Sequence, residues 1–433
     1  MELLDLPDDA LLAVLGFLPP RQLFACRVAC RRLRDLCLHR YLWRHVSLDG
    51  GKAGVVLAAL ALAPCVKSIV CSGPRDVQAS RVKTTNCVVT RLKLFVFGGS
   101  NRMALAMEMI QRLYALGGLR ELDVNIRAIQ STAPLLQQVY YLRDLRKLSL
   151  SVNGHVEALA AKCNELETKP SLRELHYDAL TGGRAFLELL LRTHASTLQD
   201  VSLYFCADED IPASTLLKIP GLRSLRCFAT TSLHHLAVLP SLHTIRLIGL
   251  CASGALQFLR DASHLRTVEL DACDRHSLPA LGSSRSAPLI ETLLVRNLVV
   301  RYRVFSEKQL LSVLPEFPAL KVVDLDGWPS DDFLRGVSPV SAPSLATLAV
   351  HCPLQCAHAL VHSPAVQSLL LRNPRLHLFV REFLENPCGK KKKSCSWCRK
   401  GCHGELLGRK SPMSFSSHVK TAGCPSDCFN VTA

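Results

Sequence analysis

LRELDV (residues 119–124), LRKLSL (145–150) and LRELHY (172–177) are three copies of one short pattern that recurs through most of this 433-residue chain. Each copy has apolar residues at its first, fourth and sixth positions. Further clear copies are LQDVSL from Leu198, LRSLRC from Leu222, LHTIRL from Leu242, LRTVEL from Leu265, IETLLV from Ile290, LKVVDL from Leu320, LATLAV from Leu345 and VQSLLL from Val366. Weaker copies begin at Val66 and Val89. The clear copies begin about 25 residues apart on average, so one structural unit repeats along the chain.

The segments between these copies have the apolar spacing of helices, which predicts a unit of strand, turn and helix. The clearest helical segments are 104–116, 156–166, 185–192, 256–262 and 309–313. A period near 25 residues with this apolar pattern is typical of leucine-rich repeats. One such unit cannot bury its leucine face alone, so neighbouring units must stack. The predicted fold is therefore an α/β leucine-rich-repeat solenoid, or horseshoe, over residues 49–385, with a parallel sheet on its concave side and helices outside.

Residues 6–46 do not follow the repeat and read LPDDALLAVLGFLPPRQLFACRVACRRLRDLCLHRYLWRHV. Apolar residues from Leu11 to Leu18 give a helical stripe, and the Pro19-Pro20 pair predicts the end of that helix. A second short helix is expected near Gln22, and a third over residues 29–38. Three short helices bury little surface on their own, so a partner or the adjoining solenoid must complete their core.

This stretch closely resembles an F-box, the module that docks on the Skp adaptor of cullin-RING ubiquitin ligases. The matching residues are Leu6, Pro7, Leu11, Val14, Leu15, Leu18, Pro19, Leu23, Val28, Cys30, Arg31, Arg32, Leu42 and Trp43. The resemblance implies that residues 1–48 hold the Skp adaptor and, through it, a cullin and a RING protein. It implies contacts from Leu6, Pro7, Leu11, Val14, Leu15, Leu18, Pro19, Leu23, Val28 and Trp43. The alternative is a helical cap that shields the first repeat from water.

Side chains that alternate with the core residues of each strand should face away from the core and could bind a target protein. In the middle repeats these predicted target-binding residues are His176, Tyr204, Arg226, Phe228, Arg246, Glu269, Arg296 and Asp324. Tyr, Phe and Arg often dominate the binding energy of interfaces. The alternative is a solvated surface of mixed charge.

Residues 386–433 form a basic, cysteine-rich segment that is expected to be a flexible tail. Cys395 and Cys398 have the spacing of half a zinc site, with Cys402 and His403 close in sequence. Cys424 and Cys428 form a second pair. No cofactor is predicted, and zinc in the tail is the alternative. The lysines at 390–393 could be a nuclear import signal or a plain solvated run.

Composition and motifs argue against several classes of function. The net charge is +16, but the body of the chain has no basic stripe interleaved with aromatic residues, so nucleic-acid binding is not expected. No targeting segment or membrane helix is expected, and the 19 cysteines are interpreted as reduced thiols in the cytosol or nucleus. P-loop, GxGxxG, GxSxG and HExxH patterns are missing from the sequence.

Three hypotheses remain. The resemblance implies a non-catalytic substrate-recognition subunit of an SCF-type ubiquitin ligase, in which the helical module holds the Skp adaptor and the repeats hold an unidentified target. The second is a scaffold without a ligase, and the third is a zinc-dependent nucleic-acid binder that uses the tail.

Overall fold

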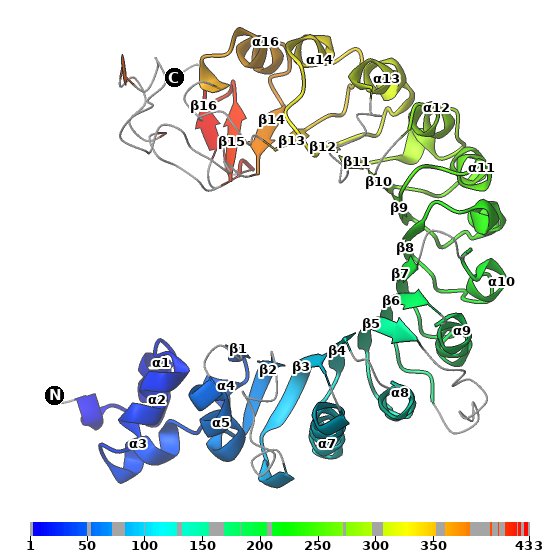
Figure 1. The fold of residues 1–433 in the computed structure, drawn as a ribbon. Coiled ribbons are helices and arrows are strands. Elements are labelled where there is room, and N and C mark those ends of the chain that lie inside the picture. Colours follow the sequence, from blue (N-terminus) through cyan, green and yellow to red (C-terminus); the bar gives the residue numbers. More distant parts are fainter. Residues whose placement is uncertain are drawn as a thin grey trace. The chain divides into compact units, whose positions relative to one another are not determined.

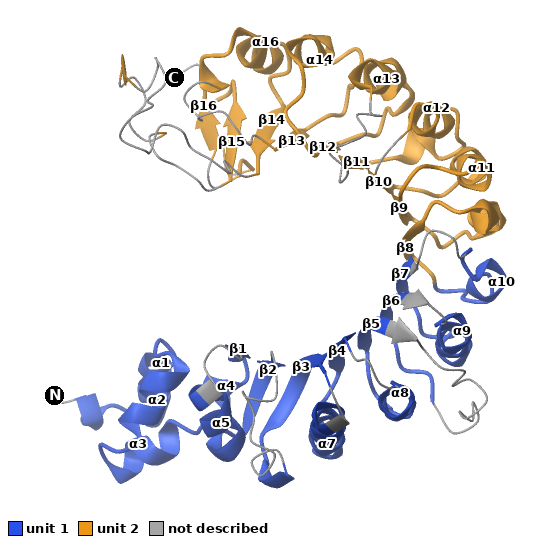
Figure 2. Cartoon of the chain, viewed as in Figure 1, with its two compact units in different colours: residues 1–221 blue, residues 222–433 orange. Residues whose placement is uncertain are grey.

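The computed structural model describes residues 3–49, 53–71, 83–98, 100–127, 132–155, 169–181, 183–205, 210–271, 274–296, 306–351, 360–381, 399–400, 406, 412–421, 423–425 and 428–431. They form two compact units, residues 1–221 and 222–433 (Figure 2). Each unit is described by itself below.

The first unit contains parallel strands that pair in the order of the chain (Figure 1). They are β1 (Ser47–Asp49), β2 (Cys65–Cys71), β3 (Val88–Phe97), β4 (Glu121–Arg127), β5 (Lys147–His155), β6 (Glu174–Thr181) and β7 (Asp200–Phe205). The helices between them are α5 (Ala53–Leu62), α7 (Ser100–Ala115), α8 (Ala133–Tyr140), α9 (Arg184–Thr193) and α10 (Ala213–Leu216). Sequential parallel pairing confirms the predicted strand-and-helix repeat.

The core of the first unit consists of aliphatic rows that run across the strands. Leu92, Leu122, Leu148 and Leu175 pair in register on β3 to β6, and each is 2% exposed or less. Helix α9 buries Phe186, Leu187, Leu189, Leu190 and Leu191. Burying one such side chain stabilises the fold by roughly 1.5–3 kcal/mol relative to its exposed state, so the rows account for much of the cohesion between repeats.

The second unit continues the same repeat. Its parallel strands are β8 (Ser224–Phe228), β9 (Thr244–Ile248), β10 (Thr267–Asp271), β11 (Thr292–Arg296), β12 (Val322–Leu325), β13 (Thr347–Val350) and β14 (His377–Val380). The connecting helices are η5 (Thr231–Val238), α11 (Ser253–Asp261), α12 (Ser277–Gly282), η6 (Ala287–Leu289), α13 (Glu307–Val313), η7 (Leu314–Glu316), α14 (Asp331–Gly336) and α16 (Pro364–Arg372). In Figure 1 the helices of this unit lie on one side of its strands. We call the opposite side of each unit's sheet its open face.

The residues before the first strand form a group of helices and do not follow the repeat, as predicted. They are η1 (Leu3–Asp5), α1 (Asp8–Leu15), α2 (Pro20–Cys26), α3 (Arg31–Leu36) and α4 (Arg40–Trp43). We call residues 3–46 the helical module. The prediction of three helices missed η1 and α4, each of which is at most four residues long. Pro20 begins α2 because a proline fits the first helical position, where no N–H is needed.

One repeat copy was assigned to the wrong element. The sequence VQSLLL from Val366 lies in α16, where Val366, Leu369 and Leu370 face the core at helical spacing. The strand of that repeat is β14, whose Leu378 and Val380 are buried. The error arises because apolar residues three apart fit both the repeat pattern and a helix. The expected helix at 156–166 lies outside the described residues.

The prediction of a flexible tail over 386–433 does not hold for two described segments. Strand β15 (Met413–Ser416) pairs antiparallel with β14, and β16 (Cys428–Asn430) pairs parallel with β15. Every residue of β15 is buried. These strands therefore extend the sheet of the second unit beyond the last repeat.

None of the helices in the described ranges is long and apolar enough to cross a membrane.

A glycine in α11 tests the packing between repeats. A Cβ atom on Gly254 would lie 1.7 Å from the backbone carbonyl oxygen of Thr231, whereas a Cβ on Gly54 would meet nothing within 4 Å. We expect Gly254→Ala to lower the melting temperature by several degrees, because backbone must shift to admit the methyl group. Gly54→Ala should leave it unchanged or raise it slightly, since alanine favours a helix. Calorimetry on the two variants checks this, and equal effects would contradict it.

A buried histidine predicts how stability depends on pH. His194 is 2% exposed, and its Nδ1 accepts a hydrogen bond from the backbone N–H of Ser171. Burial lowers the pKa of His194 to about 4, so the imidazole is neutral in the folded protein. The unfolded chain binds a proton below about pH 6.5 and the folded chain does not, so this stability is present above pH 6.5 and is lost as pH falls towards 4.

The expected slope is at most about 1.4 kcal/mol per pH unit between those limits. Denaturant titrations from pH 7 to 4.5 should show a shallower fall for His194→Gln than for the parent chain. The exposed His276 provides the control, because His276→Gln should keep the parent slope. If His194→Gln kept the pH dependence of the parent chain, protonation of His194 would not explain the loss of stability.

Candidate functional site

The helical module has its own small core. Trp43 is fully buried, donates a hydrogen bond from Nε1 to the Cys37 carbonyl at 2.7 Å and packs against Phe24 with ring centroids 5.0 Å apart. Leu11, Leu15 and Leu23 are at most 4% exposed. These contacts hold α1, α2 and α4 together and fix which side chains remain outside.

Arg32 attaches the start of the chain to α3. Its guanidinium forms an ion pair with Asp8 at 2.6 Å and donates hydrogen bonds to the carbonyl oxygens of Leu4 and Leu6, the latter at 2.7 Å. One side chain therefore positions the Leu6-Pro7 step. The sequence resemblance included Arg32 but did not predict this role.

Exposed apolar side chains are concentrated on the helical module. Of the 14 large hydrophobic residues that are exposed in the described structure, six lie in residues 3–41: Leu3, Leu4, Val14, Phe17, Val28 and Tyr41. Phe17 is 90% exposed and Val28 is 85% exposed. Such a concentration is typical of a surface that a partner covers.

The predicted adaptor-binding residues fall into two groups. Val14, Val28, Pro7 and Pro19 are exposed, and Leu6 and Leu18 are half-buried. Leu11, Leu15, Leu23 and Trp43 are buried inside the module, so the prediction that they contact a partner directly is wrong for this conformation. Their role is to pack the helices. Sequence reasoning missed Phe17, although a large aromatic residue just after an amphipathic helix was a visible signal.

The open face of the first unit carries charged pairs over a hollow of about 700 Å³. Arg91 pairs with Glu121 at 2.5 Å, Lys93 with Asp123 at 2.8 Å, and Lys147 with Glu174. Each pair joins residues in register on neighbouring strands. Because the hollow is lined by both signs of charge, its chemistry suits a polar protein surface better than a polyanion.

Aromatic side chains lie on the same face. The His176 and Tyr204 rings have centroids 5.1 Å apart, and both side chains are half-buried. Phe95 and Phe97 stack with centroids 6.0 Å apart, while Lys93 lies over Phe95 and Arg127 over Phe97. Sequence reasoning named His176 and Tyr204 but missed the two phenylalanines. Applying the same alternation to the weak repeat copy at Val89 would have found Phe95.

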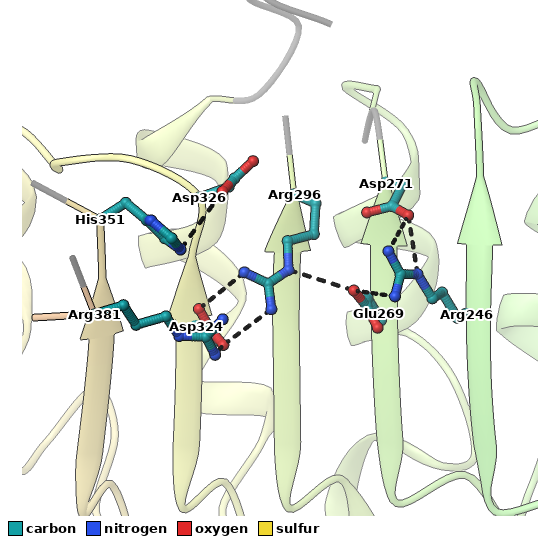
Figure 3. A network of polar contacts seen from close by, with 8 residues as sticks. All are labelled: Arg246, Glu269, Asp271, Arg296, Asp324, Asp326, His351 and Arg381. Atoms are coloured by element: carbon teal, nitrogen blue, oxygen red, sulfur yellow. Dashed lines mark hydrogen bonds and ion pairs between the residues drawn. The ribbon is translucent and has the colours of Figure 1, made fainter. Parts of the chain in front are cut away.

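The open face of the second unit carries a network of arginines and carboxylates on successive strands (Figure 3). Arg246 pairs with Glu269 at 3.1 Å and with Asp271 at 2.9 Å. Arg296 pairs with Glu269 at 3.3 Å and with Asp324 at 3.2 Å, and Arg381 also pairs with Asp324. We call Arg246, Glu269, Asp271, Arg296, Asp324 and Arg381 the arginine–carboxylate network.

The carboxylates of this network lie beneath the arginines. Asp324 and Asp271 are each 1% exposed, whereas Arg246 retains 25% and Arg381 32% of their side-chain exposure. Burial, and then the charge of Arg296, lower the pKa of Arg381. The prediction that Asp324 contacts a target directly is therefore wrong, because Arg296 and Arg381 cover it.

The other predicted target-binding residues of this unit keep partial access to solvent. Arg226 and Phe228 are half-buried on β8, and Arg296 and Glu269 are each 15% exposed at the side chain. Burial, followed by the charge of Arg246, lowers the pKa of Arg226. The solvent-accessible part of this open face therefore consists mainly of the outer edges of guanidinium groups that carboxylates hold in place.

The proposed zinc ligands of the tail lie outside the described residues: Cys395, Cys398, Cys402 and His403. Among the described residues, three possible ligands converge elsewhere. One ligand atom from each of His377, Cys424 and Cys428 lies within 4.8 Å of the others.

Comparison with known families places the helical module. The F-box-like family matches residues 3–49, which are the helical module and the first strand. The repeats that follow are leucine-rich repeats by their in-register parallel strands. The chain is thus similar to F-box/leucine-rich-repeat proteins in both of its parts. This match overlaps the F-box that the sequence predicts at residues 1–48.

This chain is similar to curated proteins whose names combine an F-box with leucine-rich repeats. It is 23% identical to F-box/LRR-repeat protein 12 of Homo sapiens over 335 residues, covering 75% of this chain and 88% of that protein. The Bos taurus protein of the same name is also 23% identical, with the same coverage. A crystal structure of a TLR13–ssRNA13 complex is similar over 67% of this chain and 44% of that one, at 15% identity and a TM-score of 0.34. Proteins of the F-box/LRR family are typically non-catalytic adaptors.

The buried carboxylate of Asp324 gives a test of the network. Asp324→Asn should destabilise the protein by roughly 2–4 kcal/mol, because it leaves Arg296 and Arg381 partly buried without their shared counter-charge. Glu174→Gln, which removes the exposed partner of Lys147, should cost less than about 1 kcal/mol. Equilibrium urea unfolding measures both variants. Similar losses in the two would show that the burial of Asp324 has no energetic consequence.

Proposed function

We propose that this protein is the substrate-recognition subunit of an SCF-type ubiquitin ligase. In this proposal the F-box docks a Skp-type adaptor, which links it to a cullin and a RING protein, and the repeats bind the target. The observation that carries it is an F-box-like module with concentrated exposed apolar side chains, directly before a leucine-rich-repeat array.

The exposed side chains of the module are what an adaptor would cover. Leaving Phe17, Val28 and Val14 in water is unfavourable, and burying them against a partner would gain about 25 cal/mol for each Å² of apolar surface. The buried side chains around Trp43 pack α1 and α2 together before docking, so little ordering would be needed when the adaptor binds. Arg32 would present the Leu6-Pro7 step in a fixed position.

The open faces are the proposed target-binding surfaces. Both combine arginines held by carboxylates with half-buried side chains such as Tyr204 and Phe228. Arginines that are already oriented lose less conformational freedom on binding, which favours a specific protein surface. The carboxylates offset much of the positive charge, so a nucleic-acid backbone is a less suitable partner.

The protein itself would catalyse no step. It would hold a lysine of the target near the conjugating enzyme and so raise the effective concentration of the reacting groups. The reduced cysteines that the sequence predicts favour the cytosol or nucleus as the compartment of this proposed activity.

Two exposed residues of the F-box test adaptor docking. Phe17→Glu and Val28→Glu, each made in the full-length chain, should weaken capture of purified Skp adaptor about tenfold or more, because each places a charge in an apolar contact. The folded state should be preserved, since both side chains are largely in solvent. Binding is measured by biolayer interferometry with the adaptor as probe.

Val340→Glu is the matched control, because Val340 is 90% exposed but lies among the repeats of the second unit. It should bind the adaptor like the parent chain. If the parent chain does not bind the adaptor, the ligase proposal fails and the scaffold hypothesis takes its place. If both F-box variants bind normally, docking does not use this surface.

A further inference from the structure

We propose that the protein holds a structural zinc ion at the end of its sheet, bound by His377, Cys424 and Cys428 with His418 as the fourth ligand. These four residues differ from the cysteines at 395–402 that the sequence pattern favoured. They come from β14, from the turn after β15 and from the start of β16.

The ligand atoms are close to the spacing that zinc requires. Tetrahedral zinc with ordinary bond lengths to sulfur and nitrogen places its ligand atoms about 3.3–3.8 Å apart. His418 Nε2 lies 3.3 Å from Cys424 Sγ. The ligand atoms of His377, Cys424 and Cys428 all lie within 4.8 Å of one another, and the two imidazole centroids are 4.9 Å apart. On zinc binding the farthest of the three clustered atoms would move up to about 1 Å closer, and His418 Nε2 would approach from the side of Cys424.

The histidines are oriented as metal ligands. Nδ1 of His418 lies 2.8 Å from the Pro374 carbonyl oxygen, so this nitrogen carries the proton, and Nε2 accepts a hydrogen bond from the Cys424 thiol at 3.3 Å. Loss of the thiol proton on zinc binding would leave the Nε2 lone pair available to the metal. Nε2 of His377 is buried and has no hydrogen-bond partner among the described residues. A buried imidazole nitrogen without a partner is costly, and a metal ion would satisfy it.

The local backbone holds the cysteines in place. The N–H of Thr421 donates to Cys424 Sγ at 3.3 Å, and Ser416 Oγ lies 3.3 Å from Cys428 Sγ. Two sulfurs and two imidazoles suit zinc, whereas Mg²⁺ and Ca²⁺ prefer oxygen ligands.

The ion would add a second link between the last repeat and the segment that follows β15, a strand that already pairs with β14. His377 belongs to the last repeat, whereas His418, Cys424 and Cys428 belong to the segment that turns back along it. Strand β16 has only three residues and contacts the sheet through β15. Zinc would therefore fix the end of the array, a position at which solenoids need a cap.

Alkylation of the parent chain tests the site without any variant. The protein, purified without chelator, is treated with iodoacetamide and mapped by mass spectrometry. Cys424 and Cys428 should react about tenfold or more slowly than after treatment with a zinc chelator. Cys26, which lies in the F-box, is the internal control and should not respond to the chelator. Immediate reaction overturns the proposal, as does protection that only a reductant removes, since that indicates a disulfide.

Metal analysis of variants assigns the ligands. Zinc measured by inductively coupled plasma mass spectrometry should fall by about one ion per chain in Cys424→Ser/Cys428→Ser. It should not change in the control Cys395→Ser/Cys398→Ser/Cys402→Ser. A loss confined to that control, or another metal in place of zinc, would overturn the assignment.

A spectroscopic measurement covers the case in which the serine variant does not fold. Cobalt-exchanged parent protein should show the visible absorption of a tetrahedral ion with thiolate ligands, and His418→Ala should alter it. A spectrum of octahedral cobalt in the parent chain would exclude the four-ligand site.

Discussion

Stacked aliphatic rows hold each strand of this protein to the next, because no repeat can bury its own leucines. In the second unit Leu225, Ile245, Val268 and Leu293 pair in register on β8 to β11, and each has no measurable exposure. The other face of the same strands is thereby left without helices. The arginine–carboxylate network of this unit lies on that remaining face (Figure 3).

The repeat could be predicted from sequence because its cause is local: apolar residues must alternate along a short strand and recur at the length of one unit. Prediction failed at Val366, where the same apolar spacing fits a strand of the repeat and a helix. It also failed where the pairing of a strand depends on a segment far away in the sequence. Strand β15 has only four residues, and it forms because Phe415 pairs with Leu378, which lies far away in sequence. No local pattern in the tail indicates that partner.

For the candidate sites, as for the fold, the sequence predicts which residues lie on a strand face or helix but not how deeply they are buried. Alternation correctly assigns Asp324 to the open face, but its burial depends on how far Arg296 and Arg381 extend across neighbouring strands. In the F-box, the helical stripe does not reveal that Leu11 and Leu15 face inward while Val14, between them in number, faces solvent. The burial of Asp324 and of Leu11 and Leu15 depends on how neighbouring strands and helices pack against one another. Likewise, His377 and Cys428 are about fifty residues apart, and only the reversal of the chain at β15 brings them together.

That reversal at β15 also bears on self-association. A parallel ladder of identical units would end in a strand whose unpaired backbone groups could accept the first strand of another copy, and long filaments could grow in this way. Here the sequence of parallel strands is broken by an antiparallel one, and the outermost described strand, β16, is only three residues long. So short an edge leaves few amide and carbonyl groups for an incoming chain. By this argument, the short edge at the end of the array disfavours growth by strand addition.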